Sequence, residues 1–174
     1  MQISKARAYT FVIALCSLFC VLTLGFTNAA AARPALNSQN AAKDILATLK
    51  SHPELSTLVR AIEIVHFEQI LANASQVTLF APSNAAFEKW DASELDDLLN
   101  HPAALETFLE FHASNERFSG KDLESMDYAE MINGGLVSID FDGKSLLVND
   151  ATIVNRDIPV QNGFIHVIDT LLEP

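Results

Sequence analysis

The sequence is poor in the residues that build thiol chemistry and phosphate-binding loops. Its two cysteines, Cys16 and Cys20, both lie in an apolar segment near the N-terminus. If that segment is removed, the mature chain has no thiol, which excludes disulfides, metal–thiolate sites and a cysteine nucleophile. The six glycines form no Gly-rich phosphate loop, and no serine stands in a Gly-x-Ser-x-Gly nucleophile elbow.

The histidines also lack the spacing of a metal site. They form neither His-x-His nor His-Glu-x-x-His. His166 stands among apolar neighbours, so we expect a hydrogen-bonded structural histidine there. Asp140–Gly143 is similar to the start of a calcium loop, but the EF-hand has glycine sixth and glutamate twelfth, whereas here glycine is fourth and Ala151 is twelfth. We therefore expect no metal, no cofactor and no enzymatic activity.

Positive charge is scarce as well. Eleven Lys and Arg residues stand against 22 Asp and Glu residues, which gives a formal net charge of −11. Nucleic acids and anionic lipids are bound mainly through basic side chains, so a strongly acidic surface argues against both as partners.

The first 32 residues have the three-part layout of a cleaved signal peptide. Lys5 and Arg7 form a basic start, Thr10–Leu24 is nearly continuous apolar sequence, and small residues follow at Asn28–Ala32. A retained membrane anchor would normally need an apolar run of about 20 residues. We expect a secreted protein, periplasmic if the source is a Gram-negative bacterium. The expected segments are a signal peptide (1–32), a short polar lead-in (33–40) and one domain (41–174).

Helical periodicity dominates the first half of the expected domain. Ala41–Lys50 carries its apolar residues on one face, His52-Pro53 breaks that helix, and Pro53 can open the next. Asp91–Glu94 has a capping-box pattern, and we interpret the acidic residues there as partners of the helix dipole rather than as metal ligands. Further helices are predicted over residues 55–62, 92–99 and 102–112, with one more short turn of helix at residues 67–71.

A strand that leads directly into a helix is predicted at Val77–Phe87. The run Val77–Phe80 is apolar and suits a buried strand. Pro82 ends the strand because it has no backbone N–H, and Ser83 can cap the following helix. Pro82 and Phe87 then occupy the positions of a hydrophobic staple.

From Tyr128 onward the apolar residues alternate as they do in strands, with turn signals at Asp142-Gly143 and Asn162-Gly163. We predict an α+β domain, with helices mostly before Phe118, strands mostly after Tyr128, and Val77–Phe80 paired with the late strands. The predicted strands are Val137–Phe141, Leu146–Val148, Ala151–Asn155 and Phe164–Asp169. Six residues should be buried: Val77, Leu79, Phe80, Phe87, Ile165 and Val167.

Two of these segments resemble the signatures of the fasciclin-type (FAS1) domain. Val77–Phe87 is similar to the family string Thr-Val-Phe-Ala-Pro-Thr-Asn/Asp-x-Ala-Phe. Asn162–Asp169, with Leu171, Leu172 and Pro174, is similar to the family ending Asn-Gly-Val-Ile-His-Val-Ile-Asp and its Leu-and-Pro tail. The resemblance covers about Ala41–Pro174. It implies the FAS1 fold, in which N-terminal helices pack on a wedge of two mostly antiparallel β-sheets.

The resemblance also implies candidate adhesion sites. Two adhesive pairs of animal family members correspond here to Phe111-His112 and Asp157-Ile158. The first pair departs from the family pattern, because Phe111 lacks the usual tyrosine hydroxyl and Ala113–Asn115 replaces a Val-x-Pro-Gly type of turn. Structural roles are the alternative, with His112 ending a helix and Ile158 in the core. Asn73 begins an Asn-Ala-Ser sequon and is a candidate N-glycosylation site.

The resemblance favours a secreted, non-enzymatic binding module that acts in cell-surface or extracellular-matrix adhesion. Its partner would be an extracellular or cell-surface protein or glycan, or a second copy of the chain. The first alternative is a carrier of an apolar small molecule such as a carotenoid, as in some algal FAS1 proteins. The second is a structural or stress-related periplasmic protein.

Overall fold

The computed structural model describes residues 45–173. The expected signal peptide, the lead-in and the first four residues of the predicted domain lie outside this range. Within it, no helix is both long enough and apolar enough to cross a membrane. The helical elements are residues 45–50, η1 (Pro53–Leu55), α2 (Ser56–Val65), α3 (Glu68–Asn73), α4 (Asn84–Phe87), α5 (Ala92–Asn100), α6 (Pro102–Phe111) and α7 (Gly120–Leu123).

The strands form one hydrogen-bonded sheet in the order β2-β1-β7-β6-β5-β4-β3. All neighbours are antiparallel except β1 and β7, which run parallel from the Val77–Gly163 pair to the Pro82–Ile168 pair. The sheet nearly closes on itself, because the Ile132 N–H donates to the Ala113 carbonyl at 2.8 Å. The strands are β1 (Val77–Pro82), β2 (Ala113–Ser114), β3 (Tyr128–Glu130), β4 (Leu136–Phe141), β5 (Leu146–Val148), β6 (Ala151–Val160) and β7 (Gly163–Ile168).

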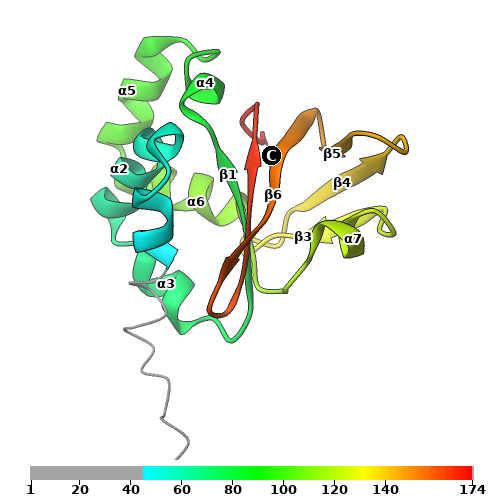
Figure 1. Ribbon diagram of the computed structural model, residues 1–174. Helices are drawn as coiled ribbons and strands as arrows, with labels where there is room; N and C mark the ends of the chain where they lie inside the picture. Colours follow the sequence, from blue (N-terminus) through cyan, green and yellow to red (C-terminus); the bar gives the residue numbers. More distant parts are fainter. Residues whose placement is uncertain (1–44, 174) are drawn as a thin grey trace, which may run out of the picture. The chain divides into compact units, whose positions relative to one another are not determined.

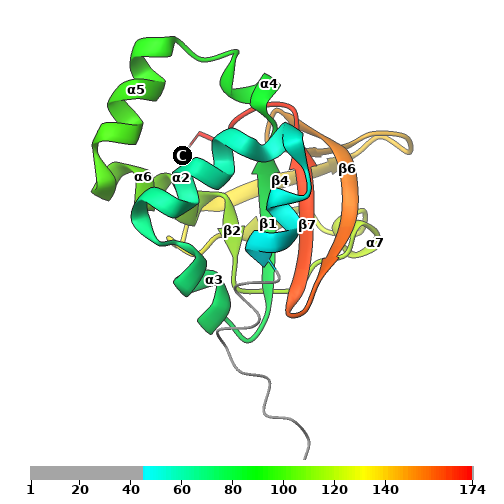
Figure 2. The same cartoon turned by 60° about the vertical axis from the view of Figure 1, so that its left-hand side comes forward.

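Strand β1 lies between two apolar cores. Helices α2, α5 and α6 lie on one side of β1 and β7, and β3, β4 and α7 lie on the other (Figure 1 and Figure 2). Val77, Leu79 and Ala81 belong to the core on the helical side, whereas Phe80 belongs to the core enclosed by the curved sheet. A strand that is covered on both faces needs a continuous apolar run, which is what the sequence has here.

The main predictions about the fold are confirmed. The early strand pairs with the last one, and all six residues expected in the core are at most 3% exposed. Ser83 caps α4 by accepting a hydrogen bond from the Ala86 N–H. Gly143 adopts a left-handed φ of 87° in the β4–β5 hairpin, where the Asp142 carboxylate accepts from the N–H groups of the two residues that follow Gly143.

Several local predictions are wrong. Gly163 is the first residue of β7 and not part of the turn before it. Asp91 does cap α5, but through the Ser93 N–H rather than through a capping box with Glu94. The capping box that the structure does contain joins Ser119 and Asp122 at α7. Strand β2 was not predicted, and the strand predicted at Ala151–Asn155 continues as β6 for five more residues, to Val160.

The substitution Gly163→Ala tests the pairing of β1 with β7. A Cβ on Gly163 would lie 1.6 Å from the Val77 carbonyl oxygen, so β1 and β7 would have to separate. Crowding of this kind usually costs about 1–3 kcal/mol and occasionally more, and we expect Gly163→Ala to lower the free energy of unfolding by about 3 kcal/mol or more. Denaturant titration measures this change in the free energy of unfolding.

Gly134→Ala is the matched control. Gly134 has a φ of +80° and no neighbour within 4 Å of the added methyl group. The control should therefore cost only backbone strain, about 1 kcal/mol. Equal losses in the two variants would contradict the steric role of Gly163.

Candidate functional site

The first candidate pair, Phe111-His112, is buried. Phe111 is 4% exposed and packs in the core enclosed by the sheet, and His112 is fully buried where α6 ends. Neither side chain can contact a partner protein in this structure. The structure therefore assigns this pair to the interior, in line with the structural alternative.

His112 bridges α6 and the C-terminal tail. Its Nδ1 lies 2.8 Å from the Phe108 carbonyl, and its Nε2 lies 3.0 Å from the backbone N of Leu172. Only the neutral tautomer with the proton on Nδ1 satisfies both contacts, because the Leu172 N–H needs an acceptor. Burial lowers the pKa of His112 from 6.5 to about 4. His112 is thus a neutral structural residue at ordinary pH.

The second candidate pair lies on a β-bulge. Between the Asn155–Val167 and Ile158–Ile165 pairs, Arg156 and Asp157 oppose one residue of β7. Asp157 is exposed and has a left-handed φ of 62°, whereas Ile158 is half-buried against the helical-side core. Of the four candidate side chains, that of Asp157 is the one that lies exposed.

The Asp157 side chain is held by α7. Its Oδ1 accepts a hydrogen bond of 2.7 Å from the N–H of Gly120, the first residue of α7. A Cβ at Gly120 would come within 2.9 Å of the other carboxylate oxygen, so glycine permits this close approach. The ion pair between Arg156 and Glu124, with 2.6 Å between charged atoms, joins the same two segments. The carboxylate is therefore fixed in position on the surface.

The buried His166 side chain stabilises the bulge through a hydrogen bond. Its Nδ1 accepts from the Asp157 N–H at 3.3 Å, and its Nε2 lies 3.0 Å from the Phe118 carbonyl. The extra residue of a bulge leaves a backbone N–H without a ladder partner, and here the imidazole takes that place. Burial lowers the pKa of His166, against the opposing effects of the Phe118 carbonyl and the Asp157 carboxylate. The prediction of a structural histidine is confirmed.

Phe80 connects the two candidate pairs. Its N–H donates to the His112 carbonyl at 2.8 Å, and its ring stacks on His166 at 5.8 Å between centroids. The pairs are therefore linked through β1, but they do not form one surface. Asn73 is exposed at the end of α3, and its glycosylation stays a prediction.

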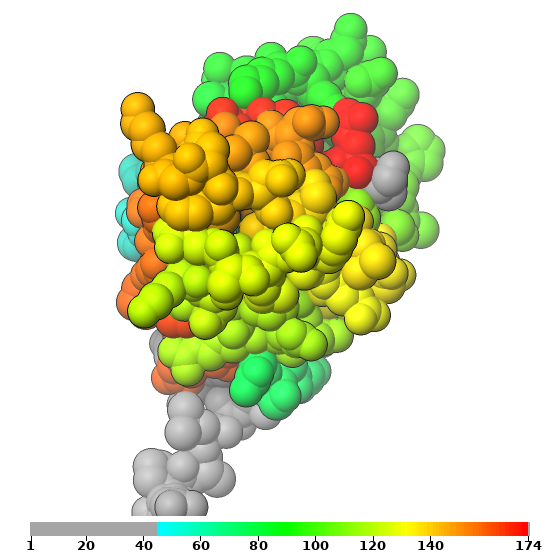
Figure 3. Space-filling model, turned by 90° about the vertical axis from the view of Figure 1, so that its right-hand side faces the viewer, coloured from blue at the N-terminus to red at the C-terminus, as the bar shows by residue number. Residues whose placement is uncertain are grey.

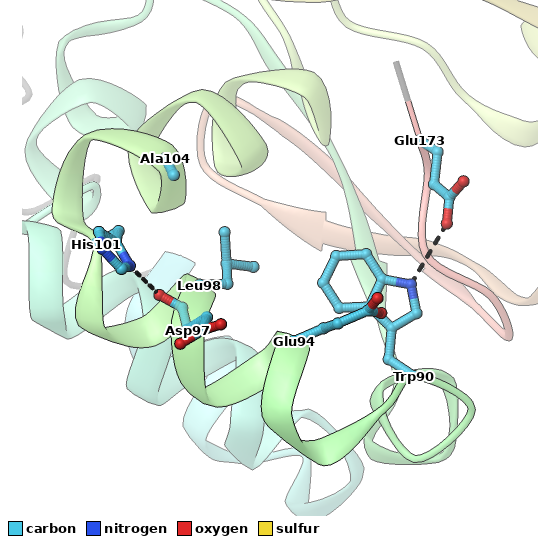
Figure 4. Close-up of a pocket in the computed structure, with 7 residues that line it drawn as sticks. All are labelled: Trp90, Glu94, Asp97, Leu98, His101, Ala104 and Glu173. Atoms are coloured by element: carbon cyan, nitrogen blue, oxygen red, sulfur yellow. Dashed lines mark hydrogen bonds between the residues drawn. The ribbon is translucent and has the colours of Figure 1, made fainter.

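A pocket of about 480 Å³ lies beside α5 (Figure 4), and it was not predicted from the sequence. Trp90 forms one wall, and its Nε1 donates to Glu173 at 3.4 Å. Three carboxylate side chains line the pocket, whereas no Lys or Arg side chain does. The lining residues are Trp90, Glu94, Asp97, Leu98, His101, Ala104 and Glu173.

The sequence does contain a signal for this pocket. Glu94, Asp97, Leu98 and His101 stand at i, i+3, i+4 and i+7, so they share one helical face. Glu173 could not be foreseen, because it comes from the tail 83 residues after Trp90 in sequence. Within residues 45–173, no group of three or more His, Cys, Asp or Glu side chains is arranged to hold a metal ion.

This arrangement of helices on a nearly closed mixed sheet defines a FAS1-type α+β protein. Residues 53–174 match the Fasciclin domain, and the chain belongs to that family. It is 31% identical to immunogenic protein MPB70 of Mycobacterium bovis over 157 residues, which cover 86% of this chain and 80% of MPB70. It is also 31% identical to periostin of Homo sapiens over 127 residues, or 72% of this chain.

The fold has a solved counterpart in a FAS1 domain pair from the insect cell adhesion molecule fasciclin I. The TM-score is 0.62 at 22% sequence identity, over 75% of this chain. The match covers 51% of that domain pair, and the match to periostin covers 15% of periostin. The chain thus spans only part of these two relatives.

The buried histidines predict a pH dependence of stability. The pKa of His112 is about 4 in the folded protein, below the ordinary 6.5, so the unfolded chain takes up the proton first as the pH falls. The neutral, buried His112 makes its full contribution to the free energy of unfolding above pH 6.5, and this contribution is lost as the pH falls towards 4. At about 1.4 kcal/mol per pH unit, the loss is roughly 3 kcal/mol. Urea titrations at pH 7 and pH 4.5 measure it.

Two variants separate this effect from others. His112→Asn should reduce the slope of the profile between pH 6.5 and 4, and the lowered pKa of His166 accounts for the slope that remains. His66→Asn, at an exposed residue with a left-handed φ that asparagine also adopts, should change the profile far less. The lowered pKa values of Asp91, Asp122 and Asp142 act mainly below their ordinary 3.8, and that of Glu54 mainly below 4.5, at the acid end of this window. A wild-type protein of equal stability at both pH values would contradict the assignment.

Proposed function

We propose that this chain is an exported, non-enzymatic binding protein that acts in adhesion outside the cell. The single observation that carries the proposal is the exposed, rigidly held Asp157 carboxylate. The insect relative is described as a cell adhesion molecule, which supports the class of function. The signal-peptide layout of residues 1–32 supports export.

The Asp157 bulge is suited to a contact surface for physical reasons. A non-glycine residue with positive φ is costly, and such strain concentrates at functional sites. Here the hydrogen bond from Gly120 and the support of His166 hold the carboxylate, so little side-chain entropy is lost on binding. Figure 3 shows that residues around α7, β3 and β4 (lime to yellow) form a broad face on this side. We infer that the partner, an extracellular protein or glycan, contacts the bulge and α7.

Phe111 and His112 contribute indirectly in this proposal. His112 is linked to β1 through its carbonyl, and β1 supports the bulge through Phe80 and His166. Replacing either residue would act on binding by disturbing the core. A loss of adhesion in such variants would therefore be accompanied by a loss of stability.

Asp157→Asn tests the role of the carboxylate. Asparagine keeps an oxygen that can accept from Gly120 and tolerates a left-handed φ, so the variant removes mainly the charge. We expect the adhesion of cells to beads coated densely with the protein to fall at least about fivefold, which corresponds to the loss of about 1 kcal/mol that fewer than a third of interface residues exceed. Dense coating is needed because one domain gains no avidity by itself.

Asp96→Asn, on exposed α5 at the helical side of the sheet, is the matched control and should adhere like the wild type. Asp157→Ala should lose adhesion as well. Urea titration must show that Asp157→Asn is folded. Full adhesion by a folded Asp157→Asn protein would refute the role of this surface.

The competing hypothesis is a carrier of a carotenoid or another apolar molecule. The pocket beside α5 has apolar walls at Trp90 and Leu98, but its three carboxylates would lose water against a hydrocarbon without gaining a partner. We therefore expect the protein purified from its native source to be colourless in its visible spectrum. A stoichiometric visible chromophore would favour the carrier over adhesion.

A further inference from the structure

The pocket beside α5 combines two kinds of surface. Trp90, Leu98 and Ala104 provide apolar walls, and Glu94, Asp97 and Glu173 provide carboxylates. Figure 4 shows the Glu94 side chain extending towards the Trp90 indole, with Glu173 joined to the indole from the other side. A volume of about 480 Å³ is within the range of small-ligand sites, about 300–1,000 Å³.

Lys89, the basic residue directly before Trp90 in the sequence, does not neutralise these carboxylates. Lys89 directs its ammonium group to the tail before Glu173, where it donates to Thr170 at 3.1 Å and lies 4.0 Å from an Asp169 oxygen. His101 donates from Nδ1 to the Asp97 backbone carbonyl at 2.6 Å, so its bonded nitrogen is directed to the backbone. Three negative side chains thus line one open pocket, with no Lys or Arg side chain in its walls.

The occupant that matches both surfaces is an amphipathic cation. A lysine side chain has an apolar stem that lies well along apolar walls and an ammonium group that carboxylates attract. A cation within about 6 Å of an indole centroid is attracted by the ring as well. A purely apolar ligand would leave the carboxylates desolvated, and a metal ion would make no use of the apolar walls.

We propose that this pocket binds an ammonium or guanidinium group carried on an apolar stem, the chemistry of a Lys or Arg side chain or of a free alkylamine. The pocket shares no residue with the Asp157 bulge, so the proposal does not depend on the proposed function. The formal charge of −11 also attracts cationic partners towards the protein.

Trp90 is the only tryptophan in the chain, so its fluorescence reports on the pocket directly. The probe is a capped Gly-Lys-Gly peptide, titrated at low ionic strength, and its uncharged match is the same peptide with norleucine in place of lysine. We expect a saturable change of the emission with the lysine peptide, weakened by added salt. The norleucine peptide should give no saturable change.

Two substitutions test the carboxylates. Glu94→Gln and Glu173→Gln keep the shape of each side chain, and the amide oxygen introduced by Glu173→Gln can still accept from the indole N–H. Each should weaken binding by about two- to fivefold, the range of a solvent-accessible ion pair. Glu130→Gln removes the same charge from β3, outside the pocket, and should bind like the wild type.

The outcomes are distinct. The small-amine probe is n-pentylamine, which carries one ammonium group like the lysine peptide. Tighter binding of the lysine peptide than of n-pentylamine assigns the cation to a partner protein, and the reverse assigns it to a small amine. Both results support the cation site. An equal response to the norleucine peptide, full binding by the Glu94→Gln/Glu173→Gln double variant, or equal weakening in Glu130→Gln would overturn it. Asp157→Asn should leave this titration unchanged even if it abolishes adhesion.

Discussion

The parallel pairing of β1 with β7 is the constraint on which the rest of the described structure depends. It joins a segment that follows the first helices to the last strand of the chain, so neither half can complete the sheet alone. Both strands contribute to the core on the helical side and to the core enclosed by the sheet. The close contact between Gly163 and the Val77 carbonyl fixes where the pairing starts. The register then places Phe80 opposite His166.

The two buried histidines accept hydrogen bonds from two backbone N–H groups that this topology leaves without backbone partners. The bulge in β6 leaves the Asp157 N–H without a partner in the β-ladder. The N–H of Leu172, in the C-terminal tail, also has no backbone partner. An unpaired buried N–H costs about 1–3 kcal/mol, and an imidazole nitrogen satisfies each of them. The two rings need opposite tautomers, because His166 accepts at Nδ1 whereas His112 accepts at Nε2. Their burial is therefore a consequence of satisfying the backbone.

The sequence predicted the parts of the fold that depend on local chemistry. The apolar run Val77–Phe80 and the cap at Ser83 needed no knowledge of distant residues. The two-residue strand β2 has no periodicity of its own, and it exists because the sheet closes against it. The bulges of β6 depend on the partner strand, so an alternating pattern could not reveal them. The burial of Phe111 and the contribution of Glu173 to the pocket also depend on residues distant in the sequence, so they could not be predicted from it.

The acidic charge of the chain is distributed unevenly between the two candidate surfaces. Near the bulge, Arg156 pairs with Glu124, and the charges of Lys121 and Arg117 act on Asp122 at the start of α7. This surface offers both signs of charge and suits a polar partner with its own mixed surface. Around Trp90 the carboxylates lack such partners within the pocket lining. In the two proposals, selection for cations is therefore assigned to the pocket, whereas the bulge is proposed to select a partner by shape and by the fixed position of one carboxylate.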